Sequence, residues 1–244
     1  MSSFVRLSLI DKFNENSRAH FLLHSKPLGY PRDYPCEPSH GFPIFEPLTK
    51  SDIPVAMHAF NDLGRVLDPK TTLLHFHKAD EKFAHVLIDP LKFGNKWGHF
   101  MCLASPDVTL SDGMVEWERI KNTSWSRAVA ATWASQGIKV IPTLRWRLPT
   151  DYDFVVCGLP KHSVFAVSTY GSVRDAELKR VFIDGLREMV KRLEPIAIIV
   201  YGTGIKNIHD IVGPGVEVYL HPTPTQRIRE EKARLKNESE ARLF

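Results

Sequence analysis

Short apolar runs alternate with amphipathic stretches along most of the chain. Each run is rich in β-branched and aromatic residues and is bounded by Gly, Pro, Asn or Asp, which is typical of buried strands. The next-to-last run, IAIIVY, is apolar throughout, as expected for a strand that helices cover on both faces. The pattern predicts seven strands: Pro54–Phe60, Thr71–His77, Phe100–Ser105, Ile138–Arg145, Val164–Ser168, Ile196–Tyr201 and Val216–Leu220.

Apolar positions three and four residues apart predict helices between these strands. A helix begins at Asp80 and is broken or kinked at Pro90, because proline removes a backbone donor. Met114–Gln136 and Val173–Leu193 are the longer helices, and the second has the clearer apolar stripe. Two local signals accompany them: a candidate interruption at Asn122–Ser124 and an S-x-x-D capping box formed by Ser172 and Asp175.

The repeated order of strand and helix predicts an α/β fold with a mainly parallel sheet. We expect a β/α-barrel-like (TIM-barrel-like) arrangement, closed or incomplete, and keep a doubly wound open sheet as the alternative. Residues 51–222 form the predicted α/β domain. Residues 1–50 are a proline- and aromatic-rich segment expected to pack on it, with a weak edge strand at Phe4–Ile10, and residues 223–244 are a charged tail or helix.

Polar residues follow several of the predicted strands, above all in the stretch GIKVIPTLRW, Gly137–Trp146. The carboxyl ends of parallel strands share one edge of the sheet, where ligands bind in such folds. The candidate catalytic residues are Asp107, Arg145 and Asp80, and the candidate substrate-binding residues are Trp146, Ser168, Thr169, Tyr201 and Gly202.

Three of these side chains indicate the chemistry. The planar guanidinium of Arg145 can grip a phosphate or carboxylate. Asp107 can act as a general base, and the indole of Trp146 can stack on a nucleobase or sugar. Structural roles remain open for all of them: Asp107 as a helix cap, Arg145 as the partner of Asp151 or Asp153, and Trp146 and Tyr201 as packing residues.

Composition narrows the function classes only slightly. The formal charge of +4 permits a nucleic-acid partner without requiring one. The 3 cysteines are an odd number without metal-ligand spacing, which argues against a disulfide framework and favours a reducing cytoplasm. Cys102 and Cys157 lie in apolar runs, so we expect buried, inert thiols. No signal peptide and no membrane-spanning run is recognised.

A metal site is an alternative that the histidines raise. His75 and His77 lie two apart on a predicted strand and therefore point to one face. With His58, His99 or Asp80 they could form a site, but the spacing matches no known ligand pattern. We therefore assign no metal ligand, and the sequence identifies no cofactor.

Several motifs in this order resemble the DUF4417 family of bacteria, phages and other mobile elements. They run from GFPIFEP to IIVYGTG and cover about two thirds of the chain: His75-Phe76 with Asp80 and Phe83, Ser105-Pro106-Asp107, Arg127, GIKVIPTLRW and AVSTYG. The resemblance implies the fold and a phage or mobile-element origin, and it implies no activity. The chain departs from the family pattern at Ala79, where a second acid is expected, and at Val108 and Thr109.

Two main functions follow as hypotheses. The first is an enzyme that acts on a phosphorylated, nucleotide or nucleic-acid substrate at the strand carboxyl ends, in the cytoplasm of a bacterial host. The second is a non-catalytic accessory protein of a mobile element that binds DNA or a host protein. A metal-dependent hydrolase that uses the histidines ranks third.

Overall fold

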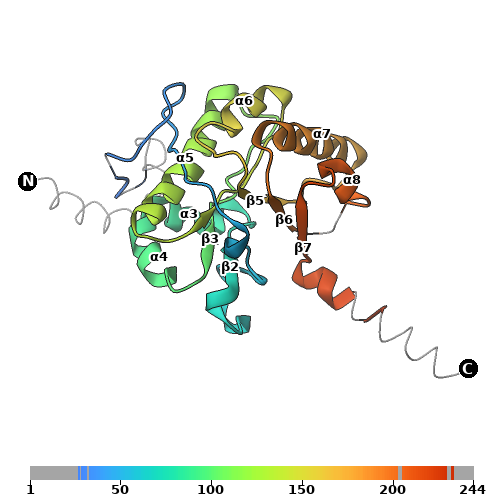
Figure 1. The fold of residues 1–244 in the computed structure, drawn as a ribbon, viewed down its shortest axis with the longest axis horizontal. Coiled ribbons are helices and arrows are strands. Elements are labelled where there is room, and N and C mark those ends of the chain that lie inside the picture. Colours follow the sequence, from blue (N-terminus) through green and yellow to red (C-terminus); the bar gives the residue numbers. More distant parts are fainter. Residues whose placement is uncertain (1–26, 28, 32, 203–204, 230–231, 234–244) are drawn as a thin grey trace, which may run out of the picture.

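A computed structural model describes residues 27, 29–31, 33–202, 205–229 and 232–233 (Figure 1). All seven predicted strands are present, each shorter than or close to its predicted length. They are β1 Ala56–Ala59, β2 Thr72–His75, β3 Cys102–Ala104, β4 Val140–Ile141, β5 Val164–Ser168, β6 Ala197–Tyr201 and β7 Glu217–His221. The expected edge strand Phe4–Ile10 lies outside the described residues.

Every strand pair is parallel, which confirms the predicted sheet. One sheet has the order β1-β2-β3-β4 and the other β5-β6-β7. A parallel bridge between Thr143 and Ala166 connects the two, so spatial order follows chain order without the reversal of a doubly wound sheet. Among the described residues no pairing joins β7 to β1, so the sheet is open and no barrel closes.

The central strand is much shorter than predicted. Only Val140 and Ile141 belong to the ladder with β3. Pro142 has no N–H to donate, and a proline ends regular pairing for that reason. Backbone pairing then moves to β5, because Leu144 donates its N–H to the carbonyl oxygen of Ala166 over 2.8 Å. The chain thus crosses from one sheet to the other within this stretch.

The helices lie between the strands as expected. They are α3 Asp80–Ile88, α4 Pro90–Trp97, α5 Glu116–Ser135, α6 Tyr152–Val155, α7 Ala176–Leu193 and α8 Ile208–Val212, with short 3₁₀ turns η1 Lys50–Asp52, η2 Leu63–Arg65, η3 Pro69–Thr71 and η4 Pro149–Asp151. Residues 224–229 are also helical.

Two predicted helix signals need correction. The candidate interruption at Asn122–Ser124 is absent, and α5 runs through it. The expected capping box at Ser172 is wrong, because α7 begins later: Asp175 is its N-cap and accepts the N–H of Leu178 over 2.8 Å. The break at Pro90 is confirmed, since it separates α3 from α4 and starts the second helix, where a missing N–H costs nothing.

Helices cover the outer faces of the sheets (Figure 1). The core under α3, α4 and α5 is built on Phe76, Trp125 and Trp133. A second core lies under α7 and α8, and a third joins inward-facing residues of six strands, from Met57 to Tyr201. Phe42 of the N-terminal segment is 1% exposed and belongs to the second core. No helix in the described part of the chain has the length and apolarity to cross a bilayer.

Candidate functional site

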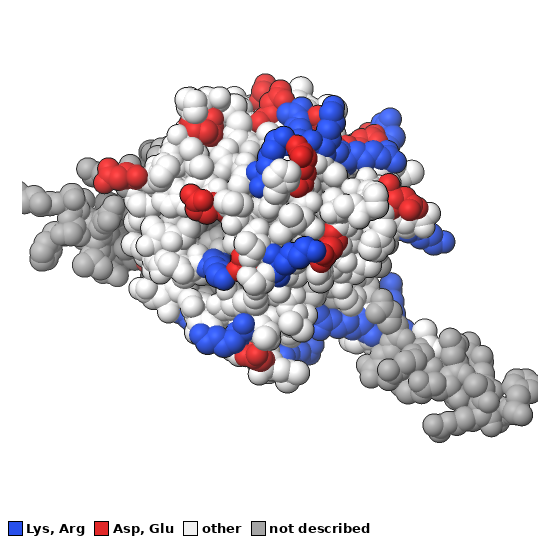
Figure 2. Space-filling view, in the orientation of Figure 1, with Lys and Arg blue, Asp and Glu red and all other residues white. Residues whose placement is uncertain are grey.

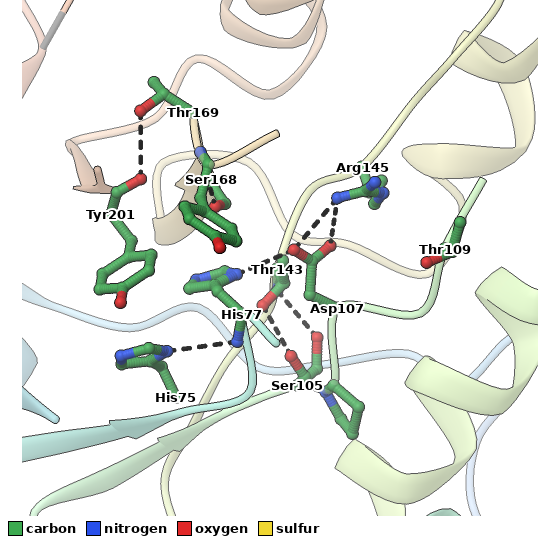
Figure 3. Close-up of polar contacts among 12 residues, drawn as sticks. His75, His77, Ser105, Asp107, Thr109, Thr143, Arg145, Ser168, Thr169 and Tyr201 are labelled. Atoms are coloured by element: carbon green, nitrogen blue, oxygen red, sulfur yellow. Dashed lines mark hydrogen bonds and ion pairs between the residues drawn. The ribbon is translucent and has the colours of Figure 1, made fainter. Parts of the chain in front are cut away.

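The side chain of Asp107 is the centre of a polar cluster at the carboxyl edge of the sheets (Figure 3). It lies beyond β3 and is only 6% exposed. Nη1 of Arg145, beyond β4, donates to both Asp107 carboxylate oxygens over 3.2 Å. Nδ1 of His77, beyond β2, lies 3.0 Å from Oδ2 of the same carboxylate. Three neighbouring strands thus bring one acid, one base and one permanent cation together.

The electrostatics of the cluster keep Asp107 ionised. Burial alone would raise the pKa of this carboxyl, but the charge of Arg145 and the hydrogen bond from His77 outweigh it and lower the pKa. An ionised Asp107 accepts a hydrogen bond from Nδ1–H of His77, and in the imidazole tautomer that donates this bond the lone pair is on Nε2. That Nε2 is buried and has no hydrogen-bond partner among the described residues.

The His77 ring packs between the rings of Tyr201 and His75 and the Asp107 carboxylate. It stacks on Tyr201 with centroids 5.3 Å apart, and on His75 with centroids 5.1 Å apart. Nδ1 of His75 also accepts the backbone N–H of His77 over 3.2 Å. Burial, with His77 nearby, lowers the pKa of His75 well below its usual range, so His75 is a neutral packing group.

Loop-to-loop hydrogen bonds fix the segments that carry Asp107 and Arg145. The N–H of Thr143 donates to Oγ of Ser105 over 2.8 Å, and its hydroxyl donates to the Ser105 carbonyl oxygen over 2.7 Å. Ser126 of α5 donates to the carbonyl oxygen of Pro106 over 2.6 Å. These bonds leave Asp107 and Arg145 little freedom, which is how a site is preorganised.

Asp80 contacts the cluster through a loop rather than directly. Its carboxylate accepts the N–H of Thr109 over 3.2 Å and the Thr109 hydroxyl over 3.0 Å. Burial raises the pKa of Asp80, and the bonds from Thr109 lower it in part. The predicted catalytic residue Asp80 therefore fixes the loop after Asp107.

Two cavities open on either side of Arg145 and share part of their lining. The first, here the aromatic lobe, has a volume of about 440 Å³, and the second, the polar lobe, of about 600 Å³. Both are lined by Asp107, Thr109, Arg145, Ser168, Gly171 and Arg174. The aromatic lobe adds an apolar wall of Leu144, Trp146, Leu178, Val181 and Phe182 and the charged residues Asp112, Arg147, Asp175 and Glu177. The polar lobe adds His77, Lys78, Thr169, Tyr170 and Gln226.

The predicted substrate-binding residues differ in their access to these lobes. Ser168 lines both lobes and Thr169 the polar lobe. Trp146 lines the aromatic lobe, although it is 8% exposed and its Nε1 donates to the Val181 carbonyl oxygen over 3.1 Å. Tyr201 lies behind His77, and Gly202 packs on Thr169, whose hydroxyl oxygen would lie 2.4 Å from an added Cβ.

The expected structural partners of Arg145 are otherwise engaged. Asp151 pairs with Arg119 over 2.7 Å, and Asp153 pairs with Arg192 over 2.6 Å. Arg145 does pair with a carboxylate, but that carboxylate is Asp107 of the predicted site itself.

Sequence reasoning missed two residues of the site. The sequence patterns suggest His77 as a metal ligand or as a core group paired with His75, although a histidine at the end of a strand at the binding edge is also the signal for an acid–base role. Arg174 lines both lobes from the loop before α7. Nothing in its local sequence distinguishes it from the other arginines of that region.

The histidines near β2 do not form a metal site with the neighbours proposed for them. Among the described residues, the group of three donor side chains close enough to share an ion is Glu37, His40 and Cys157. Cys157 also corrects an expectation, because it is half-buried rather than buried. Cys102 is buried as expected, and burial raises the pKa of its thiol to about 12.

Comparisons with known proteins identify relatives. The family described as "Domain of unknown function (DUF4417)" matches residues 39–214. The Gene 1 protein of Mycobacterium phage L5 is 32% identical over 157 residues, which are 64% of this chain and 67% of that protein. The Gene 1 protein of Mycobacterium phage D29 is 31% identical over 159 residues, but the chain covers only 57% of its length. No solved structure matches significantly.

Proposed function

The chain belongs to the DUF4417 family, whose description names no activity, and we propose from its site that it is an enzyme acting on a phosphorylated substrate, a nucleotide best of all, at the strand carboxyl ends. The observation that carries this proposal is the buried Asp107 carboxylate, which holds His77 and Arg145 at the border of two connected lobes.

The polar lobe suits an anionic group. Lys78, Arg145 and Arg174 contribute to its lining. Arg145 binds Asp107 through Nη1 and its side chain is 28% exposed, so the guanidinium retains donors for a ligand. Arginine binds phosphate by two parallel hydrogen bonds, and partial burial strengthens them. A phosphate in this lobe would therefore lie within reach of two or three cations.

The Asp107–His77 pair supplies acid–base chemistry next to that anion. With Nδ1–H donated to Asp107, Nε2 of His77 can take a proton from an attacking water or hydroxyl group. As the new oxygen–phosphorus bond forms and the bond to the leaving oxygen breaks, the imidazolium is stabilised by Asp107, and the leaving oxygen, on the opposite side of phosphorus, takes its proton from solvent. Arg145 balances the negative charge that develops on the phosphate oxygens.

The aromatic lobe selects the rest of the substrate. Trp146 and Phe182, with ring centroids 5.5 Å apart, give it an apolar wall against which a nucleobase can pack. Asp175 and Glu177 also line it, and carboxylates accept hydrogen bonds from sugar hydroxyls. Since both lobes share Arg145, a nucleoside phosphate would span them with its phosphate at the polar end.

The face shown in Figure 2 gives less support to the alternative, a non-catalytic protein that binds DNA. On the face shown in Figure 2, Lys and Arg are interspersed with Asp and Glu rather than gathered in one patch. Binding to duplex DNA relies on clustered cations that replace counterions along the phosphates. A compact nucleotide needs only the few cations of the polar lobe.

Calorimetric titration tests the proposal. The full chain is titrated with inorganic phosphate, ribose 5-phosphate and nucleoside 5′-monophosphates, and we expect affinity to rise in that order. Arg145→Ala should weaken binding at least about ten-fold, or about 1.4 kcal/mol. Arg187→Ala is the matched control, because Arg187 pairs with Asp184 on the exposed face of α7, and it should bind normally.

Two outcomes would contradict the proposal. One is equal binding by the Arg145→Ala and control proteins. The other is no binding of any phosphate compound together with DNA binding that weakens steeply with salt, which would favour the accessory-protein alternative.

A further inference from the structure

A hairpin of the N-terminal segment docks beside the end of α6 and contributes no residue to the lining of either lobe. Cys36 and Pro43 form an antiparallel bridge, and Gly41 makes the turn with a positive φ of 68°. The N–H of Phe45 then donates to the carbonyl oxygen of Gly158 over 2.9 Å. At Gly158 an added Cβ would lie 2.1 Å from the carbonyl oxygen of Pro43, so only glycine permits this approach.

Docking brings three metal-binding side chains together from distant parts of the chain. Sγ of Cys157 lies 3.6 Å from Nδ1 of His40, and a donor oxygen of Glu37 completes a set within 4.8 Å of one another. The ring of His40 packs on Phe42 and on Phe154, with centroids 5.5 and 6.5 Å away. Aromatic packing on two sides thus turns Nδ1 of the imidazole towards the thiol.

The Glu37 carboxylate is held in place by the backbone of the same hairpin. It accepts the N–H groups of Ser39, His40 and Phe42 over 2.7, 2.9 and 2.9 Å. Burial would raise its pKa, but these bonds outweigh it and lower the pKa, so the group is ionised. The Ser39 side chain also hydrogen-bonds this carboxylate, so a cation would take the place of that bond among the about four acceptor positions of the group. Hydrogen-bonded carboxylates of this kind are usual among metal ligands.

We propose that Glu37, His40 and Cys157 form a zinc site that fastens the N-terminal hairpin to the α/β domain. Thiolate sulfur, imidazole nitrogen and carboxylate oxygen are the ligands that Zn²⁺ takes, whereas Mg²⁺ and Ca²⁺ take oxygen. Tetrahedral zinc with the usual bond lengths separates sulfur and nitrogen ligands by about 3.5 Å. The observed separation of 3.6 Å matches this value.

The remaining coordination position faces solvent, because His40 is exposed and Cys157 only half-buried. A water molecule is the fourth ligand in this arrangement. A coordinating cysteine is a thiolate, so zinc binding must release the proton of the Cys157 thiol.

Elemental analysis and cobalt substitution test the site. The full chain, loaded with Zn²⁺ and desalted, should retain about one ion per chain. Cys157→Ser and His40→Ala should each weaken zinc binding more than about ten-fold. Cys36→Ser is the matched control, because Cys36 is an exposed thiol of the same hairpin outside the set, and it should retain zinc.

Cobalt binding provides a readout that does not depend on the folding of any variant. Co²⁺ added to the full chain should give the sulfur-to-cobalt charge-transfer absorption of a bound thiolate. Absence of this band in the unsubstituted protein would overturn the proposal. Equal zinc retention in the Cys157→Ser and Cys36→Ser proteins would overturn it too. Neither result depends on phosphate binding, so these experiments test the zinc site independently of the proposed enzyme activity.

Discussion

Two buried aspartates of this protein, Asp107 and Asp151, have similar partners and different surroundings. Asp151 is 0% exposed, and both of its carboxylate oxygens have partners within the protein. Oδ1 accepts a hydrogen bond from Nε of Arg119 over 2.7 Å, and Oδ2 accepts the N–H groups of Arg147 and Leu148. Nη1 of Arg119 donates a further hydrogen bond to the carbonyl oxygen of Met114. This pair has no contact with either lobe and joins α5 to η4.

Asp107 is also paired with an arginine, but that pair is open to the cleft. The side chain of Arg145 is 28% exposed, against 5% for Arg119. Nε of Arg145 and Nε2 of His77 are both left without partners among the described residues. Residue types alone do not separate a structural ion pair from a candidate site. The difference lies in one donor, Nε of Arg145, and one acceptor, Nε2 of His77, that the described residues leave without a partner, and mutagenesis can test it.

The largest loss of stability is expected from Asp151→Ala. Removal of this carboxylate leaves the buried charge of Arg119 uncompensated and should cost about 3–5 kcal/mol of unfolding free energy. Asp153→Ala is the control, because Asp153 pairs with Arg192 at the surface, and it should cost less than about 1 kcal/mol. Denaturant unfolding measures both. A loss below about 1 kcal/mol for Asp151→Ala would erase the distinction.

Asp107→Asn should destabilise the protein less, by about 1–3 kcal/mol, because the amide retains part of the hydrogen bonding. Its effect on function should be larger, since the neutral amide no longer fixes the His77 tautomer. We expect turnover of a phosphorylated substrate to fall by about 100-fold or more. If denaturation shows a loss as large as that of Asp151→Ala and turnover is unchanged, then Asp107 is structural as well.

Acidification should lower the free energy of unfolding already at pH values at which the carboxylates are still ionised. Burial, with Arg227 and His58 nearby, lowers the pKa of His221 to about 4. Between about pH 6.5 and pH 4, His221 is therefore protonated in the unfolded chain but not in the folded chain. The free energy of unfolding decreases by roughly 1–3 kcal/mol as the pH is lowered through this range. Asp107, whose folded pKa is lowered, contributes its loss only at still lower pH.

Urea unfolding at pH 7, 6 and 5 measures this slope. His221→Gln should reduce the slope and leave the part that comes from buried His75, while His99→Gln, at an exposed position, should leave it unchanged. An unfolding free energy that stays constant over this range would contradict the prediction.

The smallest effect on stability is expected from Arg145→Lys. The residue is partly exposed and lysine preserves the charge beside Asp107, so the unfolding free energy should change by less than about 1 kcal/mol. Phosphate binding should nevertheless weaken, because lysine lacks the planar fork. Arg119→Lys is the comparison: the same change in the closed pair should cost more stability and leave binding intact, and the reverse ranking would refute the assignment.

The positions of the strands could be predicted because helix-covered strands must be apolar throughout, as in Ala197–Tyr201. Their shared direction followed from the helices between them, and with it the meeting of Asp107 and Arg145. Strand lengths could not be predicted, since Pro142 redirects pairing to a strand more than twenty residues away. The start of α7 was missed because Ser172 and Asp175 both resemble caps locally.

The remaining features of the site depend on contacts between segments that are distant in sequence. The approach of His77 to Asp107 is set by neighbouring strands, so no spacing in the chain reveals it. The meeting of Cys157 with His40 depends on a docked hairpin in the same way. Motif spacing detects sites carried by one segment, whereas these sites are carried by several.

Gly185 of α7 faces the indole of Trp146, and a methyl group there would come within 1.9 Å of Nε1. Larger side chains at this one position would displace the ring towards the aromatic lobe and shrink the space for a ligand. The cluster of Asp107, His77 and Arg145 would keep its geometry, because Gly185 lines neither lobe. The size of the ligand that the aromatic lobe admits can therefore change through a single substitution behind its wall.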